Sequence, residues 1–419
     1  MGPLSTPRAS QYVTTMVVDG GRERLHALDA VRAIVMTLGV VLHVAWAYLP
    51  GLGPYWPLAD RTSSTALGLV FYVIHMFRMT AFYLIAGFFA RGLLQRYGLG
   101  GWLRNRLRRV FIPLVLAYLT LAPIMALAVA WSVVRSGRAG SASPIGLLLA
   151  QGSMPPFHLW FLYYLLLIYA VAIPARWLFA RFVDANGQRR ARIDVAVAAM
   201  LQRPWAPLLA GVPCAVGLLL SQGWDLWLGI RTPDRSLVPE APALGVYGLT
   251  FAFGWLLQRQ PAVLNHLGER WRGHLAVAVV ATVASLALLG ATPTYLPSPA
   301  GTRTLAYAAT YGTAAWGWTF ALLGMAVVRF GESRASWRYL ADASYFVYLV
   351  HLPLVLWLQA ALREVAWHWS IKFSIILAIT LVALMPTYHY CCTPKGRGRT
   401  MSGPQAHVAC RGSHPRCKG

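Results

Sequence analysis

Residues 26–49 read HALDAVRAIVMTLGVVLHVAWAYL, and this run decides the fold class. A helix that crosses a membrane needs about 20 mostly apolar residues, which this run provides. Similar runs recur along the chain, and we expect spans near 27–49, 66–90, 110–134, 157–181, 205–222, 243–258, 273–291, 305–328, 344–363 and 371–388. The sequence therefore predicts an all-α, polytopic integral membrane protein with about ten transmembrane helices.

The composition agrees with a membrane chain. Hydrophobic residues make up 57% of the 419 residues and charged residues only 12%, whereas soluble domains carry about 25% charged residues. The net charge is +24. Because the arginines fall in short clusters between long apolar runs, they are typical of cytoplasmic loops, and we expect no nucleic-acid partner.

The arginine clusters also predict the orientation, because cytoplasmic loops are enriched in Lys and Arg. Clusters precede the first predicted span and follow the second, fourth, sixth and eighth, whereas the loops after the first and seventh hold only Arg61 and Arg303. We therefore expect both termini in the cytoplasm, with residues 1–26 as a cytoplasmic N-terminal segment and 27–390 as the membrane domain. The first apolar run is too long for a cleavable signal, so we expect it to remain as an anchor.

The composition changes abruptly at residues 391–419, from a Leu-rich run to a segment rich in Gly, Pro, Arg, Cys and His. Four of the five cysteines lie here without C-x-x-C spacing, so the pattern favours neither a zinc site nor a disulfide framework. We expect a disordered cytoplasmic tail. The alternative is an altered or out-of-frame terminus.

The first span carries three ionisable residues, which are costly at membrane depth and therefore functional candidates. Arg32 and His43 are eleven residues apart, which returns them to nearly the same helix face, with ~16 Å between them along the axis. Asp29 lies one turn before Arg32. One stripe thus presents an anion-binding group at the inner end and an imidazole further out. The alternatives are an arginine that snorkels to the headgroups and a histidine used only for packing.

Two further groups of basic residues follow. His75 and Arg78 lie one turn apart in the second span, where Arg78 is too central to snorkel and needs an internal partner or a water-filled cavity. Arg106 and Arg109 lie in a basic loop before the third span. Positive-inside signalling alone explains such a loop, but two arginines one turn apart also suit the binding of phosphates.

Polar residues also mark the fourth and ninth spans. His158 and Trp160 stand at the outer end of the fourth, where aromatic belts are common. Ser344, Tyr348 and His351 follow an i, i+4, i+7 stripe that puts three polar groups on one face of the ninth. The competing interpretation is polar contact between helices.

In order and spacing, these elements resemble the membrane-bound acyltransferase 3 family. The resemblance is carried by Arg32 and His43 with ten residues between them, by an R-x-x-R element from Arg106 to Arg109, by HLWFL at 158–162 and by SYFVYLVH at 344–351. HMFRMTAFYLIAGFF at 75–89 is most similar to the glucan succinyltransferase subgroup, which acts in periplasmic glucan biosynthesis. The resemblance covers roughly residues 24–390.

The resemblance implies a membrane-bound O-acyltransferase, of the class that transfers groups other than aminoacyl groups. Such an enzyme sits in the bacterial inner membrane as a multi-pass protein. It moves an acyl group, here with succinyl and acetyl as candidates, from cytoplasmic acyl-CoA to a hydroxyl of an extracytoplasmic glycan. The resemblance makes His43 the base and ties the R-x-x-R arginines to the donor. We expect no metal and no permanently bound cofactor, because acyl-CoA is a substrate.

The candidate residues follow from both lines of reasoning. The catalytic candidates are His43 and Asp29, and the substrate-binding candidates are Arg32, Arg106, Arg109, His75, Arg78, His158, Trp160, Ser344, Tyr348 and His351. The leading alternative function is a transporter or flippase of a glycan or anionic substrate, since polar residues on helices also mark translocation paths. The lack of a repeated half disfavours it, and the intramembrane arginine disfavours a purely structural role.

Overall fold

The computed structural model describes residues 9–53, 56, 58–135, 156–221, 225–232, 237–295, 301–330 and 335–392. Every regular element within these ranges is helical, which confirms the all-α class. The predicted tail, 391–419, lies outside the described residues from position 393 onward.

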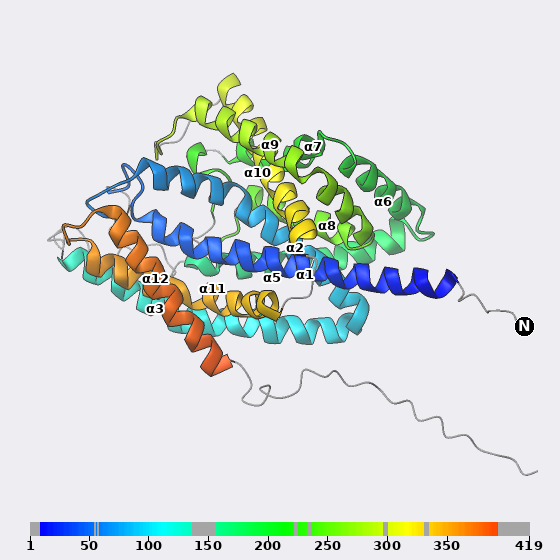
Figure 1. The fold of residues 1–419 in the computed structure, drawn as a ribbon, viewed down its shortest axis with the longest axis horizontal. Coiled ribbons are helices and arrows are strands. Elements are labelled where there is room, and N and C mark those ends of the chain that lie inside the picture. Colours follow the sequence, from blue (N-terminus) through cyan, green and yellow to red (C-terminus); the bar gives the residue numbers. More distant parts are fainter. Residues whose placement is uncertain are drawn as a thin grey trace, which may run out of the picture.

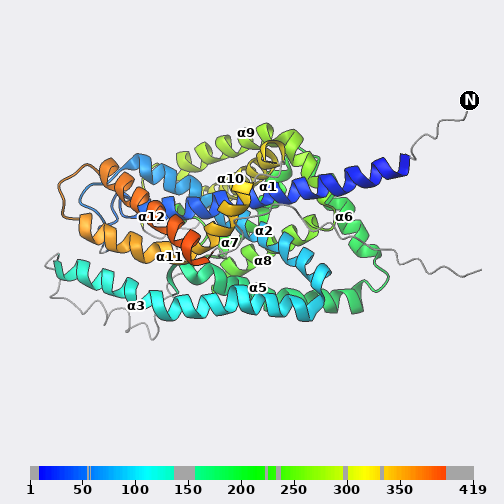
Figure 2. The ribbon, with the colours of Figure 1, turned by 60° about the horizontal axis from the view of Figure 1, so that its bottom comes forward.

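Long helices form most of the molecule and run across it roughly side by side (Figures 1 and 2). In chain order the helices are α1 (Ala9–Trp46), α2 (Thr65–Arg106), α3 (Ile112–Arg135), α5 (Trp160–Leu178), α6 (Gln188–Leu201), α7 (Ala206–Leu220), α8 (Ala241–Leu257), α9 (Leu264–Leu289), α10 (Thr302–Arg329), α11 (Ala335–Leu362) and α12 (Trp369–Cys392). Short 3-10 turns precede α5 and α9, at η2 (Phe157–Leu159) and η5 (Pro261–Val263).

Helix α1 crosses the middle of the molecule and packs against α2, α10, α11 and α12 (Figure 1). On one side, α11 also contacts α3 and α12. On the other, α2 packs on α8, and α10 packs along α7 and α9. The candidate residues of α1 are therefore enclosed by helices from both ends of the sequence.

Glycines let two of these helix pairs approach closely, as is common between membrane helices. Gly254 of α8 lies against the backbone of α2 at Leu84, and Gly211 of α7 lies against Gly312 of α10. A Cβ at any of these glycines would meet backbone atoms of the neighbouring helix. The backbones of each pair are therefore in direct contact. The contact with α8 fixes the position of α2 beside the pocket described below.

Seven helical segments within the described ranges are long and apolar enough to cross a membrane, or eight if the bent pair α6 and α7 counts as one span. This is fewer than ten, for identifiable reasons. Two predicted spans, 66–90 and 110–134, are counted together in one segment, Thr65–Arg135, but they lie in separate helices, α2 and α3. Gly98, with φ 64° and ψ −178°, interrupts the helix before a π-helical turn, η1 (Leu107–Phe111), joins α2 to α3. The predicted spans 205–222 and 243–258 correspond to α7, with 15 residues, and α8, with 17.

The first predicted span, 27–49, agrees with the structure. The apolar stretch suited to crossing a membrane is His26–Trp46, and it lies within α1, which starts at Ala9.

Candidate active site

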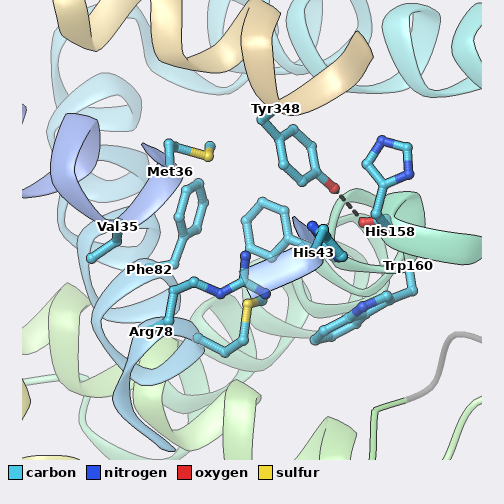
Figure 3. A pocket seen from close by; sticks show the side chains of 10 residues that line it. Val35, Met36, His43, Arg78, Phe82, His158, Trp160 and Tyr348 are labelled. Atoms are coloured by element: carbon cyan, nitrogen blue, oxygen red, sulfur yellow. Dashed lines mark hydrogen bonds between the residues drawn. The ribbon is translucent and has the colours of Figure 1, made fainter. Parts of the chain in front are cut away.

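A small pocket lies among α1, α2, α5, α11 and η2 (Figure 3). Its walls are mostly apolar and aromatic, with a few polar groups converging on the space. The lining residues are Val35, Met36, His43, Arg78, Met79, Phe82, His158, Trp160, Phe161 and Tyr348. A largely apolar pocket with a few convergent polar groups is typical of small-molecule sites.

His43 of α1 is one of two histidines that line the pocket, and a further histidine, His351, lies behind it. Nδ1 of His43 is 2.9 Å from Nε2 of His351 on α11. The other ring nitrogen of His351, Nδ1, is 3.0 Å from the Val347 carbonyl oxygen and 2.9 Å from that of Tyr348. His351 does not line the pocket itself. The sequence stripe therefore brings His351 to His43 and not to the pocket surface.

A third histidine, His158, enters the pocket from η2. Its Nε2–H donates to the carbonyl oxygen of Leu349 at 3.0 Å, and the Tyr348 hydroxyl donates to the His158 carbonyl oxygen at 2.6 Å (Figure 3). In a regular helix the Leu349 carbonyl would accept from the backbone N–H of residue 353, four residues later. Residue 353 of α11 is a proline, which has no N–H, so this carbonyl has no helical partner. A proline inside α11 thus frees the acceptor that holds His158.

Arg78 of α2 is the one arginine among the pocket-lining residues. It reaches toward His43, and its guanidinium lies against Gly39 of α1, where a Cβ would collide with it (Figure 3). Its Nε is buried without a hydrogen-bond partner, and no carboxylate of the described residues pairs with the guanidinium. A cation at membrane depth normally has a partner. The pocket therefore offers an unpaired positive charge.

The remaining α1 candidates lie toward the N-terminal side of the pocket. The Arg32 guanidinium lies 3.4 Å from the Asp29 carboxylate and 3.5 Å from the Asp342 carboxylate of α11. Val35 and Met36, one turn further along α1, line the pocket. The predicted stripe is therefore present along α1. Its N-terminal part forms an ion-pair cluster outside the pocket, and His43 lines the pocket. Asp29 contacts Arg32 and does not reach His43.

The R-x-x-R element meets the same end of α11. Arg106 donates to the Tyr169 hydroxyl at 3.2 Å, and the Arg109 carbonyl oxygen accepts from the Tyr345 hydroxyl at 2.7 Å. Tyr345 lies one turn after Asp342, the partner of Arg32. The side chain of Arg109 is exposed. Arginines from α1 and from the α2–α3 connection thus gather near one end of the pocket.

Besides His351 and the residues of the ion-pair and R-x-x-R groups, two more predicted residues lie outside the pocket. His75 turns toward the residues after α7, with Nε2 at 3.2 Å from the Thr232 hydroxyl and its ring stacked on Phe71. Ser344 donates to the Ala341 carbonyl oxygen of its own helix at 2.9 Å. Trp160, in contrast, forms part of the pocket wall.

Sequence reasoning missed Gln359 of α11, which is buried and donates to the His43 carbonyl oxygen at 3.0 Å. A single glutamine in an apolar helix gave the only signal. It also missed a buried ion pair between Asp60, after α1, and Lys372 of α12, with Nζ at 2.9 Å from both carboxylate oxygens.

Among the residues that the structure describes, no three His, Cys, Asp or Glu side chains are arranged to hold a metal.

Comparison with known proteins identifies the family of this chain. The acyltransferase 3 family, described as an acyltransferase domain, matches residues 25–389. The chain therefore belongs to this family, and it is a multi-pass membrane enzyme that transfers acyl groups other than aminoacyl groups.

Among curated proteins, the chain is similar to the glucans biosynthesis protein C of Salmonella agona and of Salmonella heidelberg. Each is 27% identical over 345 residues, which cover 80% of this chain and 84% of the relative. The protein of the same name from Salmonella dublin is 26% identical over the same length. No solved structure matches the chain.

Proposed function

We propose that this enzyme transfers an acyl group from cytoplasmic acyl-CoA to a hydroxyl of an extracytoplasmic glycan in the bacterial inner membrane. The observation that carries the proposal is His43, an imidazole that faces the pocket and is fixed from behind through Nδ1. A sugar hydroxyl is a poor nucleophile until a base accepts its proton, and imidazole suits that task near neutral pH.

The reaction balances with the groups at the site. His43 accepts the hydroxyl proton as the acceptor oxygen bonds to the thioester carbonyl carbon. The carbon–sulfur bond then breaks, and the CoA sulfur takes the proton from His43. The products are the glycan ester and free CoA, with His43 restored.

The arginine positions support entry of the donor from the end of the bundle that carries Arg32, Arg106 and Arg109. Arginine binds phosphate through charge-assisted hydrogen bonds, and CoA carries phosphates at the end remote from its thioester. The ~16 Å between Arg32 and His43 along α1 leaves room for the pantetheine arm. On this proposal that end, and both termini, face the cytoplasm.

Arg78 favours an acyl group that carries its own carboxylate. Its buried guanidinium has no carboxylate partner among the described residues, and it faces the same pocket as His43. Succinyl would supply the missing anion at the far end of the acyl chain, whereas acetyl would not. We therefore favour succinyl over acetyl.

The test is transfer by purified protein in proteoliposomes, with labelled succinyl-CoA on one side and a glucose oligosaccharide on the other. His43→Ala should lower transfer by on the order of 10²–10⁴-fold, the usual contribution of a general base, without lowering the amount of protein in the membrane. Normal acylation of the oligosaccharide by His43→Ala would reject the proposal.

A further inference from the structure

We propose that His351 is a positioning residue that acts on the reaction through His43, in the role that a carboxylate has in a Ser-His-Asp triad. This inference rests on the proposed function of His43. It assigns His351 to the base and away from substrate binding, although the sequence stripe grouped it with the binding residues.

The hydrogen bonds around His351 determine where its protons lie. Nδ1 of His351 faces two carbonyl oxygens, those of Val347 and Tyr348. Carbonyl oxygens only accept hydrogen bonds, so Nδ1 must carry a proton. In a neutral imidazole the other nitrogen is then an acceptor. Nε2 of His351 is therefore the acceptor that faces His43.

This arrangement selects the tautomer of His43. Because Nε2 of His351 accepts, Nδ1 of His43 must donate across the 2.9 Å that separates them. The proton of neutral His43 is held on Nδ1, and Nε2 is left with its lone pair for the pocket. A histidine with the opposite tautomer would present an N–H to the sugar hydroxyl and would not remove its proton.

His351 also shares the charge that forms on His43. When Nε2 of His43 takes the acceptor's proton, the Nδ1 proton shifts toward Nε2 of His351, whose own Nδ1–H stays on the two carbonyl oxygens. No net negative charge is needed to stabilise the cation. A neutral partner avoids a buried carboxylate, which is costly at membrane depth.

Helix α11 fixes the base by a second contact. Gln359, two turns after His351, donates to the backbone carbonyl oxygen of His43 at 3.0 Å. The ring and the backbone of His43 are thus both held by α11, so the ring has little freedom to turn its Nε2 away from the pocket.

The experiment compares three variants in the same proteoliposome assay with labelled succinyl-CoA and a glucose oligosaccharide. His351→Phe keeps a ring but removes both nitrogens, and kcat should fall on the order of 10²–10⁴-fold, as when a triad carboxylate is lost. KM for succinyl-CoA should change less than about threefold, because His351 does not line the pocket. In His351→Gln the side-chain carbonyl oxygen can again accept from Nδ1 of His43. The kcat of this variant should be at least about tenfold higher than that of His351→Phe.

His274→Phe is the matched control, because His274 is also a buried histidine but packs on Phe320, away from the pocket. It should keep kcat within about twofold. The inference is overturned if His351→Phe stays within tenfold of the parent, if KM rises together with the loss of kcat, or if His351→Gln is no better than His351→Phe. If His43→Ala is inactive while His351→Phe is active, only this inference fails. If His43→Ala is active, the proposed function fails with it.

Discussion

Two buried polar clusters lie along α11, and they differ in how their charges are paired. In the pocket, Arg78 has no carboxylate partner among the described residues and shares the space with His43 and His158. Beyond the C-terminal end of α11, Lys372 is fully buried and bonds both oxygens of Asp60, while the Arg363 side chain donates to the Ala59 carbonyl oxygen. A paired buried charge holds helices together, whereas an unpaired one awaits a ligand. The contrast separates a structural cluster from a functional one.

The paired cluster should show the largest effect, and on stability alone. Lys372→Met leaves Asp60 buried without its cation, which costs about 3–5 kcal/mol for a buried pair that loses one partner. The melting temperature of the protein in detergent should fall, and transfer per folded molecule should not.

A second variant tests whether pairing is the reason. Asp60→Leu combined with Lys372→Met removes both charges, and it should recover most of the lost stability, since an apolar replacement of a buried pair is often neutral. If the double variant is no more stable than Lys372→Met, pairing is not what the cluster provides.

The unpaired cluster should behave in the opposite way. Arg78→Gln should lower succinyl transfer by about 10–100-fold. A hydrogen bond to a charged group contributes about 1.5–3 kcal/mol, and its loss corresponds to a rate loss of this size. Acetyl transfer should fall much less. The melting temperature should be unchanged or higher, because the variant removes a buried charge that has no carboxylate partner among the described residues.

The donor comparison decides the role of Arg78. Rates measured with labelled succinyl-CoA and acetyl-CoA on the same preparation give the selectivity directly. An equal loss with both donors would assign Arg78 to the oxyanion of the transfer step instead of to the acyl carboxylate.

The smallest effect should come from Arg109, whose side chain is exposed and therefore screened by water. Arg109→Gln should raise KM for acyl-CoA about threefold to tenfold, as expected when one partly solvated phosphate contact is lost. Arg104→Gln is the matched control, because Arg104 is also exposed near the end of α2. Equal KM values for the two variants would show that Arg109 does not bind the donor and contributes only to the orientation of the protein in the membrane.

Much of this architecture could be predicted from local sequence. The α1 stripe and its spacing depend only on helix geometry, and Arg32, Val35, Met36 and His43 lie along the pocket side as that geometry requires. Ser344 did not follow its stripe into the pocket, because a serine inside a helix can donate to a carbonyl of its own preceding turn.

What could not be predicted depends on pairs of residues far apart in the chain. Asp60 and Lys372 are 312 residues apart, and His43 and His351 are 308 apart. Nothing in a single sequence indicates which buried polar group meets which. The count of spans also depended on the structure, because α7 and α8, with 15 and 17 residues, fall short of the about 20 residues that a membrane span needs.

Pro353 has a consequence for how this protein can be improved. A proline inside a helix is an obvious target for stabilisation, because a residue with an N–H would restore the missing backbone hydrogen bond to Leu349. That carbonyl already accepts from His158, so the repaired helix would compete with the pocket for it. We therefore expect stability and activity to trade off at this position, and a search that selects for heat resistance alone to select against catalysis here.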